Sequence, residues 1–152
     1  MRGFRITSRA HLDAPLSGIG AAMTGARWNS RGTRMAYAAQ SRSLAILEML
    51  VHVPATSVPR DHVMVVIEVP DDALQSLAEL PDGWAQLPYD PAVQAAGDAW
   101  ARSLSSLVLR VPSALVKDEW NLLVNPMHER MAQIRIVGTE ALVLDARLFQ
   151  RA

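Results

Sequence analysis

Nine prolines divide this chain into short segments, and they limit what it can fold into more than any other feature. They stand at positions 15, 54, 59, 70, 81, 88, 91, 112 and 126. Proline breaks a helix interior and cannot donate a hydrogen bond within a sheet. The segments between the prolines differ in apolar pattern and show no repeat or low-complexity tract. The sequence therefore predicts a fold built from many short helices and strands.

Helices are predicted where a capping residue precedes an apolar run. Ser41 caps a run that extends to about His52, and Asp90-Pro91 begins a helix that extends to about Ser103. Residues 71–80 form a third, short helix with acids in its first turn. Strands are predicted at 33–39, 62–69, 106–111, 121–124, 133–137 and 140–144. Helices gather in the first two thirds and strands in the last, which favours an α+β fold with a mixed or mostly antiparallel sheet.

Composition narrows the class of protein. The 152 residues, half of them apolar, are enough for one domain over 1–152. Fifteen Lys and Arg residues balance fifteen Asp and Glu residues, so no net field attracts nucleic acid or an anionic membrane. The chain has no cysteine, and no window approaches the roughly 20 apolar residues of a spanning helix. We therefore expect a soluble cytoplasmic protein that binds neither nucleic acid nor membrane directly.

A single acid interrupts the most apolar of the predicted helices. Every residue from 44 to 51 except Glu48 is apolar, and together they cover all directions of the helical wheel. We therefore expect this helix to be buried. Because a buried carboxylate is costly unless it is paired or faces a polar cavity, two interpretations remain. Glu48 is either a structural acid paired with His52 or an arginine, or a catalytic acid at the floor of a cleft.

Candidate partners for Glu48 lie in two other segments. Arg27 and Arg31 stand in a glycine-flanked loop, and a guanidinium group matches phosphate or carboxylate oxygens with two parallel hydrogen bonds. Tyr37, near the end of the strand that follows, offers a ring face with a polar tip. A second group of hydrogen-bonding side chains follows Pro112: Ser113, Asn121, Asn125 and His128. A helix cap at Ser113 and a turn at Asn125 would be structural explanations for those two residues.

Several well-known sites are missing from the sequence. The four histidines are scattered without the spacing of a metal site, so no metal is expected. There is no G-x-G-x-x-G or P-loop motif, and a Ser–His–acid hydrolase would lack the G-x-S-x-G turn. An RNA-cleaving site that uses His52 and His128 as acid and base would lack a basic track for the phosphate backbone.

Six blocks of the sequence occur in an order that is familiar from a known family. The blocks are "FRI" at 4–6, "SGIGA" at 17–21, "GARWNSRG" at 25–32, "MAYAAQSRSLAILEMLVHV" at 35–53, "GDAW" at 97–100 and "VPSALVKDEWNLLVNPMH" at 111–128. Together they resemble the RES-domain family, which supplies the toxins of bacterial toxin–antitoxin pairs whose antitoxin carries an Xre-type helix-turn-helix. The family is named for an arginine, a glutamate and a serine, which match Arg27, Glu48 and Ser113.

The resemblance implies a fold similar to the ADP-ribosyltransferase toxins and NAD⁺ as the substrate. Members cleave the bond between nicotinamide and ribose, and the ADP-ribosyl group goes to water, to inorganic phosphate or to a protein. A family tyrosine matches Tyr37, and a family asparagine matches Asn121 or Asn125. The implied partner is an Xre-type antitoxin that forms an oligomer with the toxin and covers the cleft of Arg27 and Glu48.

The chemistry of this reaction gives each matched residue a role. A fixed carboxylate at Glu48 would stabilise the oxocarbenium-like ribose that forms as nicotinamide leaves. Arg27, helped by Arg31, would hold the pyrophosphate, and Tyr37 would pack on the nicotinamide ring. Ser113 would hydrogen-bond Glu48 or the ribose, and one asparagine would orient the substrate. The alternatives are ADP-ribosylation of a host protein, an RNA-cleaving toxin and a binding module without catalysis.

Overall fold

A computed structural model describes residues 1–54 and 60–149, so Pro59 lies outside the described residues. Its strands are β1 Arg2–Ser8, β2 Ala36–Ala39, β3 His62–Glu68, β4 Leu74–Ser76, β5 Val108–Pro112, β6 Trp120–Val124 and β7 Arg135–Ala141. Its α-helices are α1 Ile19–Thr24, α2 Arg42–Leu50 and α3 Pro91–Ser103. Short 3₁₀ turns lie at Arg9–His11, Asp71–Ala73, Met131–Gln133 and Ala146–Phe149.

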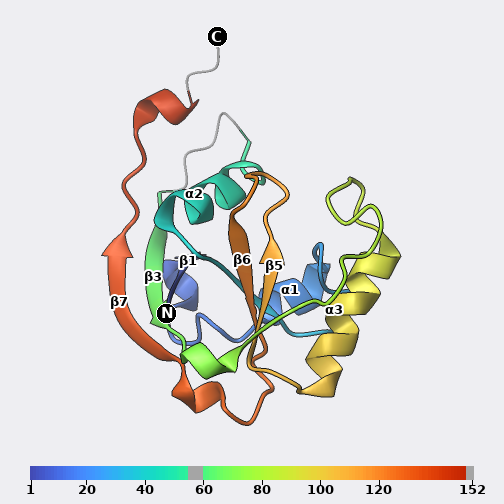
Figure 1. The fold of residues 1–152 in the computed structure, drawn as a ribbon. Helices are drawn as coiled ribbons and strands as arrows, with labels where there is room; N and C mark the ends of the chain where they lie inside the picture. Colours follow the sequence, from blue (N-terminus) through green and yellow to red (C-terminus); the bar gives the residue numbers. More distant parts are fainter. Residues whose placement is uncertain (55–59, 150–152) are drawn as a thin grey trace.

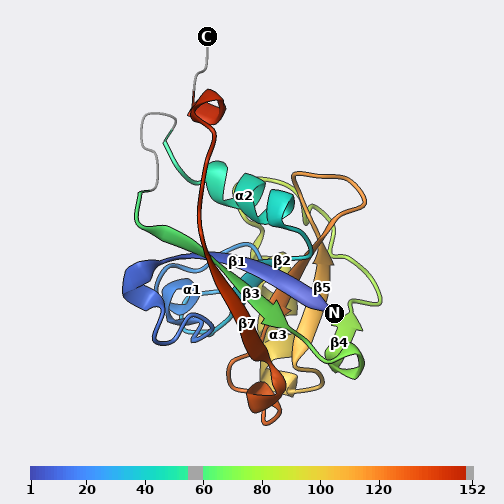
Figure 2. The ribbon, with the colours of Figure 1, turned by 90° about the vertical axis from the view of Figure 1, so that its left-hand side faces the viewer.

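All of the described strands belong to one sheet, in the order β4-β5-β6-β2-β1-β3-β7 (Figure 1). Neighbouring strands are antiparallel except for β4 and β5, which are parallel. The sheet is therefore mixed and the fold is α+β, as the sequence predicted. β7 is the outer strand next to β3 and lies at the front in Figure 2.

Two helices begin where their capping residues predicted. The Ser41 hydroxyl accepts a hydrogen bond from the Leu44 amide at the start of α2. The Asp90 carboxylate accepts one from the Ala92 amide at 2.7 Å, and Pro91 is the first residue of α3. Both caps satisfy amide groups that have no partner inside the first turn. Local sequence therefore fixed the start of both helices.

Other elements differ from the prediction because they depend on distant partners. Residues 71–80 do not form a helix: after a short 3₁₀ turn, β4 pairs in parallel with β5. The two strands expected at 133–137 and 140–144 overlap a single strand, β7. Neither β1 nor α1 was predicted from the sequence. Because β1, β2 and β3 all lie in the first half of the chain, the expected separation of helices from strands was wrong.

The prediction that the α2 segment is buried on all sides was also wrong. Leu44 and Ala45 are buried against Phe4 of β1 and Ala39 of β2. Leu47 is 42% exposed and Val51, just after the helix, is 55% exposed. An apolar helical wheel shows which residues can be buried but not which side another element covers. Figure 1 shows α2 at the top of the view.

The described core residues form three hydrophobic clusters, and two of these clusters each contain residues of one helix. Val93 and Trp100 of α3 pack with Leu109 of β5 and Leu123 of β6. Trp28 belongs to the same cluster and is 2% exposed, so both tryptophans of this cluster serve in packing. α2 packs in a separate cluster with residues of β1, β2 and β3. In Figure 1 the two helices lie well apart, α2 at the top and α3 at the right.

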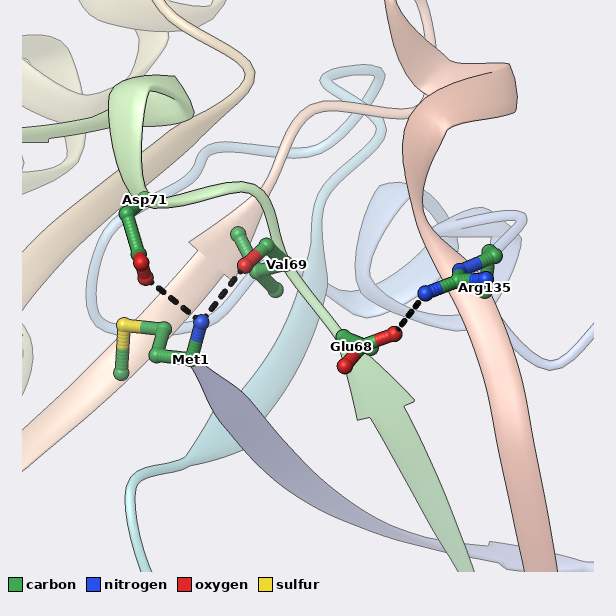
Figure 3. Close-up of polar contacts among 5 residues, drawn as sticks. All are labelled: Met1, Glu68, Val69, Asp71 and Arg135. Atoms are coloured by element: carbon green, nitrogen blue, oxygen red, sulfur yellow. Dashed lines mark hydrogen bonds and ion pairs between the residues drawn. The ribbon is translucent and has the colours of Figure 1, made fainter.

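Polar contacts tie the first strand and the edge strand to the rest of the sheet (Figure 3). The ammonium group of Met1 donates to the Val69 carbonyl at 2.8 Å and to the Asp71 carboxylate at 2.7 Å. Glu68 of β3 and Arg135 of β7 form an ion pair. Exposed pairs of this kind each contribute about 0–1 kcal/mol, so they mainly help to set register. Within 1–54 and 60–149, no helix is long and apolar enough to cross a bilayer.

Candidate active site

A cleft of about 680 Å³ opens between α2, β1 and β2 and the loops that precede β2 and α3. This volume falls within the roughly 300–1,000 Å³ typical of small-molecule sites. Among the described residues that line it, Glu48 is the only acid. The other titratable side chains of the lining are Arg5, Arg27, Tyr37, His52, His62 and Tyr89. The lining of the cleft therefore contains one carboxylate, that of Glu48, and two guanidinium groups, those of Arg5 and Arg27.

Glu48 is held by two uncharged donors. Its Oε1 atom accepts a hydrogen bond from the Ser113 hydroxyl at 2.9 Å and another from the Asn121 amide at 2.5 Å. Its Oε2 atom has no hydrogen-bond partner among the described residues, and the side chain is half-buried rather than buried. Neutral donors fix a carboxylate without cancelling its charge. The site thus presents a negative oxygen in a fixed position.

The hydrogen bonds around Ser113 orient its hydroxyl proton toward Glu48. Its oxygen accepts hydrogen bonds from the Leu115 amide at 3.1 Å and the Val116 amide at 3.3 Å. A serine hydroxyl has two acceptor positions and one proton, so the proton is left for Glu48. No helix follows Ser113, so the expected helix cap is instead a serine turn. This turn directs the hydroxyl proton at the carboxylate.

The two asparagines that the sequence left as alternatives lie in different surroundings. Asn121 stands on β6 opposite Ala39 of β2, which places its amide beside the carboxylate of Glu48. Asn125 is 1% exposed, donates to the Ala101 carbonyl at 2.8 Å and accepts from the Met127 amide at 3.0 Å. Asn125 does not line the cleft. The structure therefore brings Asn121, and not Asn125, to Glu48.

Arg27 lines the cleft from the loop that precedes β2. Its Nη1 atom donates to the carbonyls of Trp84 at 2.6 Å and Gln86 at 3.0 Å, and its guanidinium lies 5.0 Å from the centre of the Tyr89 ring. Its Nε and Nη2 atoms have no hydrogen-bond partner in the described part of the chain. These donors are available to a bound anion. Arg31 is exposed and does not line the cleft.

Tyr37 lines the cleft with its ring and anchors the Arg27 loop with its hydroxyl. The hydroxyl donates to Asn29 Oδ1 at 2.8 Å and accepts from the Trp28 amide at 3.2 Å. Burial raises the pKa of the Tyr37 phenol, so the ring is neutral at physiological pH. With its polar tip engaged by the loop, Tyr37 offers the cleft mainly its apolar ring.

Sequence reasoning missed Arg5, a second cation in the cleft. Its Nε atom donates to the Pro15 carbonyl at 2.8 Å and its Nη1 atom to the Tyr37 carbonyl at 2.7 Å. Burial lowers the pKa of the Arg5 guanidinium, which nevertheless remains charged. Among the described residues no carboxylate forms a salt bridge with it. The available signal was an arginine between two apolar residues in "FRI", but β1 itself was not predicted.

The histidines do not form a metal site or a catalytic pair. His52 and His62 line the cleft, and neither donates a hydrogen bond to Glu48 among the described residues. His128 is 7% exposed, lies outside the cleft and accepts a hydrogen bond from the Arg130 amide. His52 and His128 are therefore not brought together. Within residues 1–54 and 60–149, no group of three or more His, Asp or Glu side chains is placed to hold a metal ion.

Comparison with known proteins gives consistent relatives. The family model described as RES domain matches residues 2–145. The "Prs ADP-ribosylating toxin" of Sphingobium sp. (strain YBL2) is 39% identical over 150 residues, which cover 95% of this chain and 93% of that protein. A protein named "Toxin Res" from Yersinia enterocolitica is 39% identical over 128 residues, covering 83% and 84%.

A solved structure supports the same fold. A chain in the crystal structure of the M. tuberculosis MbcT-MbcA toxin-antitoxin complex superposes with a TM-score of 0.72. The match covers 97% of this chain and 86% of that chain. The two sequences are 24% identical, so this likeness concerns the fold.

Proposed function

This chain belongs to the RES domain family, and from that premise we propose that it is the toxin of a bacterial toxin–antitoxin pair that cleaves the nicotinamide–ribose bond of NAD⁺. The observation that carries the proposal is the arrangement of Glu48. One carboxylate oxygen is tied to Ser113 and Asn121, while the other has no partner among the described residues. Two cations, Arg5 and Arg27, line the same cleft.

The reaction requires little acid–base chemistry from the protein. The bond between ribose C1′ and the nicotinamide nitrogen breaks, and the electron pair leaves with nicotinamide, which becomes neutral. Positive charge develops on the ribose, where the free oxygen of Glu48 stabilises it. Water then bonds to C1′ and releases a proton to solvent, so NAD⁺ and water give ADP-ribose, nicotinamide and a proton. With inorganic phosphate as the acceptor, the phosphate oxygen forms that bond instead.

The rest of the cleft matches the rest of the substrate. The pyrophosphate of NAD⁺ is anionic, and charge-assisted hydrogen bonds from guanidinium groups are among the stronger polar contacts in proteins. We assign this part to Arg27 and Arg5, because Arg31 does not line the cleft. The ring of Tyr37 supports the nicotinamide. Ser113 and Asn121 act through Glu48.

The name of one relative favours a protein as a second possible acceptor of the ADP-ribosyl group. The protein from Sphingobium is named an ADP-ribosylating toxin and is 39% identical to this chain. Transfer to a protein breaks the same nicotinamide–ribose bond, with a side chain of the target in place of water. Glu48, Arg27 and Arg5 would keep the same roles. The two activities differ in whether free ADP-ribose accumulates.

An antitoxin is the expected partner of this toxin. The similar fold in the MbcT-MbcA toxin-antitoxin complex supports such a partner for this chain. We propose an antitoxin with an Xre-type helix-turn-helix whose extension covers the cleft between Arg27 and Glu48. In the cytoplasm, where NAD⁺ is found, the antitoxin would contact DNA on behalf of the complex. Deleting the extension should abolish inhibition, whereas continued inhibition by the truncated antitoxin would contradict this arrangement.

The experiment that tests the function follows nicotinamide release by proton NMR. Purified protein is incubated with NAD⁺ with and without phosphate, beside Glu48→Gln and a matched control, Glu129→Gln, whose exposed side chain lies outside the cleft. We expect release by the wild type and the control but not by Glu48→Gln. A product that needs phosphate would identify phosphorolysis. No release by folded protein would reject cleavage of free NAD⁺, and labelled NAD⁺ in lysate would then detect transfer to a protein.

A further inference from the structure

One face of α3 holds the backbone of the loop that carries Arg27. We infer that Asp98, together with Gly97, is a positioning residue that sets the Arg27 guanidinium for the phosphates of the substrate. This inference rests on the proposed function, since it concerns how the same cleft binds its ligand. It adds to the site a part of the molecule that does not line the cleft.

The first contact is a close approach of two backbones at Gly97. A Cβ atom added at Gly97 would lie 1.8 Å from the carbonyl oxygen of Trp28 and 2.8 Å from its carbonyl carbon. No side chain separates the helix from the loop at this point. Because backbone atoms cannot rotate away as a flexible side chain can, only glycine permits this packing. The Trp28 carbonyl, next to Arg27, is thus placed directly against the helix.

The second contact is made by Asp98. Its Oδ1 atom accepts a hydrogen bond from the Ser30 amide at 3.1 Å, and its Oδ2 atom accepts one from the Ser30 hydroxyl. The side chain is 6% exposed. Burial by itself would raise the pKa of the Asp98 carboxyl, but hydrogen bonds from Ser30 and Thr33 and the charge of Arg102 outweigh burial, so the pKa is lowered. Asp98 is therefore a buried anion that the proposed chemistry does not use.

The third contact between α3 and the loop is made by Gln94. The Gln94 amide donates to the Ala26 carbonyl at 2.9 Å. Gln94, Gly97 and Asp98 lie three and four residues apart and so share one face of α3. They hold alternate residues of the loop, at positions 26, 28 and 30. The backbone is thus fixed on both sides of Arg27, whose side chain lines the cleft.

The loop also has restraints that do not depend on α3. Asn29 is fully buried, and its Nδ2 atom donates to the carbonyls of Ala21 at 2.9 Å and Thr33 at 3.1 Å. Its Oδ1 atom accepts from the hydroxyl of Tyr37. Weakening the Asp98 contact should therefore shift the loop without unfolding it. Small shifts matter because misplacing a binding group by about 1 Å can cost on the order of 10²-fold in rate.

The test is a double-mutant cycle that measures the dissociation constant of ADP-ribose by calorimetry. The four proteins are the wild type, Asp98→Asn, Arg27→Ala and the double variant. If Asp98 acts through Arg27, Asp98→Asn weakens binding by about 3- to 10-fold in the wild type and has no effect in the Arg27→Ala background. Equal weakening in both backgrounds, or none in the wild type, would overturn the inference.

Two further variants separate positioning from general destabilisation. Asp90→Ala removes the cap at the start of the same helix, eight residues before Asp98, and should lower the melting temperature without changing the affinity for ADP-ribose. If Asp98→Asn fails to fold, Ser30→Ala removes the hydroxyl contact alone and enters the same cycle. A loss of affinity in Asp90→Ala as large as in Asp98→Asn would identify a merely structural role.

The same proteins keep this inference separate from the proposed function. Nicotinamide release is measured on the wild type in parallel. Binding of ADP-ribose without release would reject NAD⁺ cleavage, while the cycle would still decide the role of Asp98. Nicotinamide release by the wild type would support cleavage. If Asp98→Asn then weakens ADP-ribose binding equally in the wild-type and Arg27→Ala backgrounds, the positioning role is rejected. Failure of the wild type to bind ADP-ribose would overturn the positioning role, while nicotinamide release would still decide the proposed function.

Discussion

The two walls of the cleft hold their charged groups in different ways. Glu48 is held by side chains, Ser113 and Asn121, that are 65 and 73 residues away in the sequence. Arg27 is held by main-chain carbonyls, those of Trp84 and Gln86. A substitution can delete a side-chain donor, but it leaves a carbonyl in place. The Glu48 wall is therefore sensitive at several positions, and the Arg27 wall mainly at Arg27 and its loop.

The two walls also differ in the step of the reaction that each is suited to support. The Glu48 wall presents a negative oxygen, which suits a charge that develops during reaction, and such contacts affect kcat. The Arg27 wall presents guanidinium donors, which suit phosphates that do not change during reaction, and such contacts affect KM. If this division is correct, variants of the two walls should show opposite kinetic patterns.

The largest effect is expected at Glu48. Glu48→Gln keeps the size of the side chain and removes the charge, so kcat should fall by about 10²–10³-fold while KM changes little. Steady-state nicotinamide release measures both constants. A melting temperature close to that of the wild type would show that the fold is intact. A fall in kcat of less than about fivefold would contradict a role in stabilising the transition state.

Arg27 should give the opposite pattern. Arg27→Ala removes charge-assisted hydrogen bonds, each worth about 1.5–3 kcal/mol, so we expect KM to rise by at least about tenfold with a smaller change in kcat. Arg27→Lys keeps the charge and loses the planar pair of donors, so it should restore only part of the affinity. A fall in kcat with unchanged KM would remove the distinction between the two walls.

The two asparagines offer a matched pair of substitutions. Asn121→Ala removes one donor to Glu48 and should lower kcat by about tenfold. Asn125→Ala leaves the Ala101 carbonyl and the Met127 amide without their partner and should destabilise the fold by about 1–3 kcal/mol. Activity at a temperature where both variants are folded, together with urea unfolding, separates the effects. A loss of activity confined to Asn125→Ala would reverse our assignment.

The smallest effect is a dependence of stability on pH at Asp98. Its folded pKa is lowered, so the carboxylate contributes stability above its unfolded pKa of about 3.8 and loses this contribution as pH falls through the folded value. The gap in unfolding free energy between the wild type and Asp98→Asn should be constant near neutral pH and shrink below about pH 4. Urea titrations across this range measure it. A gap that widens in acid would contradict the charge-based contact.

The sequence predicted those parts of the fold that have local causes. Asp90-Pro91 and Ser41 gave the starts of α3 and α2, because a cap and its amide are neighbours in the chain. β4 was missed because residues 74–76 form a strand only by pairing with β5, more than 30 residues later. β1 was missed for the same reason, since its long partner is β3.

The candidate site was predictable in its residues and less so in its geometry. An acid among apolar helix residues singled out Glu48. Local pattern also made Arg27, Tyr37 and Ser113 candidates, and the family resemblance then gave these residues their roles. Which asparagine meets Glu48 depends on the register between β2 and β6, which no local pattern reveals. Arg5 became visible only when β1 and β2 were placed side by side. The contact of α3 with the Arg27 loop likewise needed the three-dimensional structure.

A crystal structure of Glu48→Gln with bound NAD⁺ would show whether the residue at position 48 faces the nicotinamide–ribose bond. This variant should bind the substrate and consume it about 10²–10³-fold more slowly than the wild type. We expect the nicotinamide ribose within about 3 Å of the side chain at position 48 and the pyrophosphate on Arg27 and Arg5. A substrate bound in the reverse direction, or outside the cleft, would contradict the division of the site into a reacting wall and a holding wall.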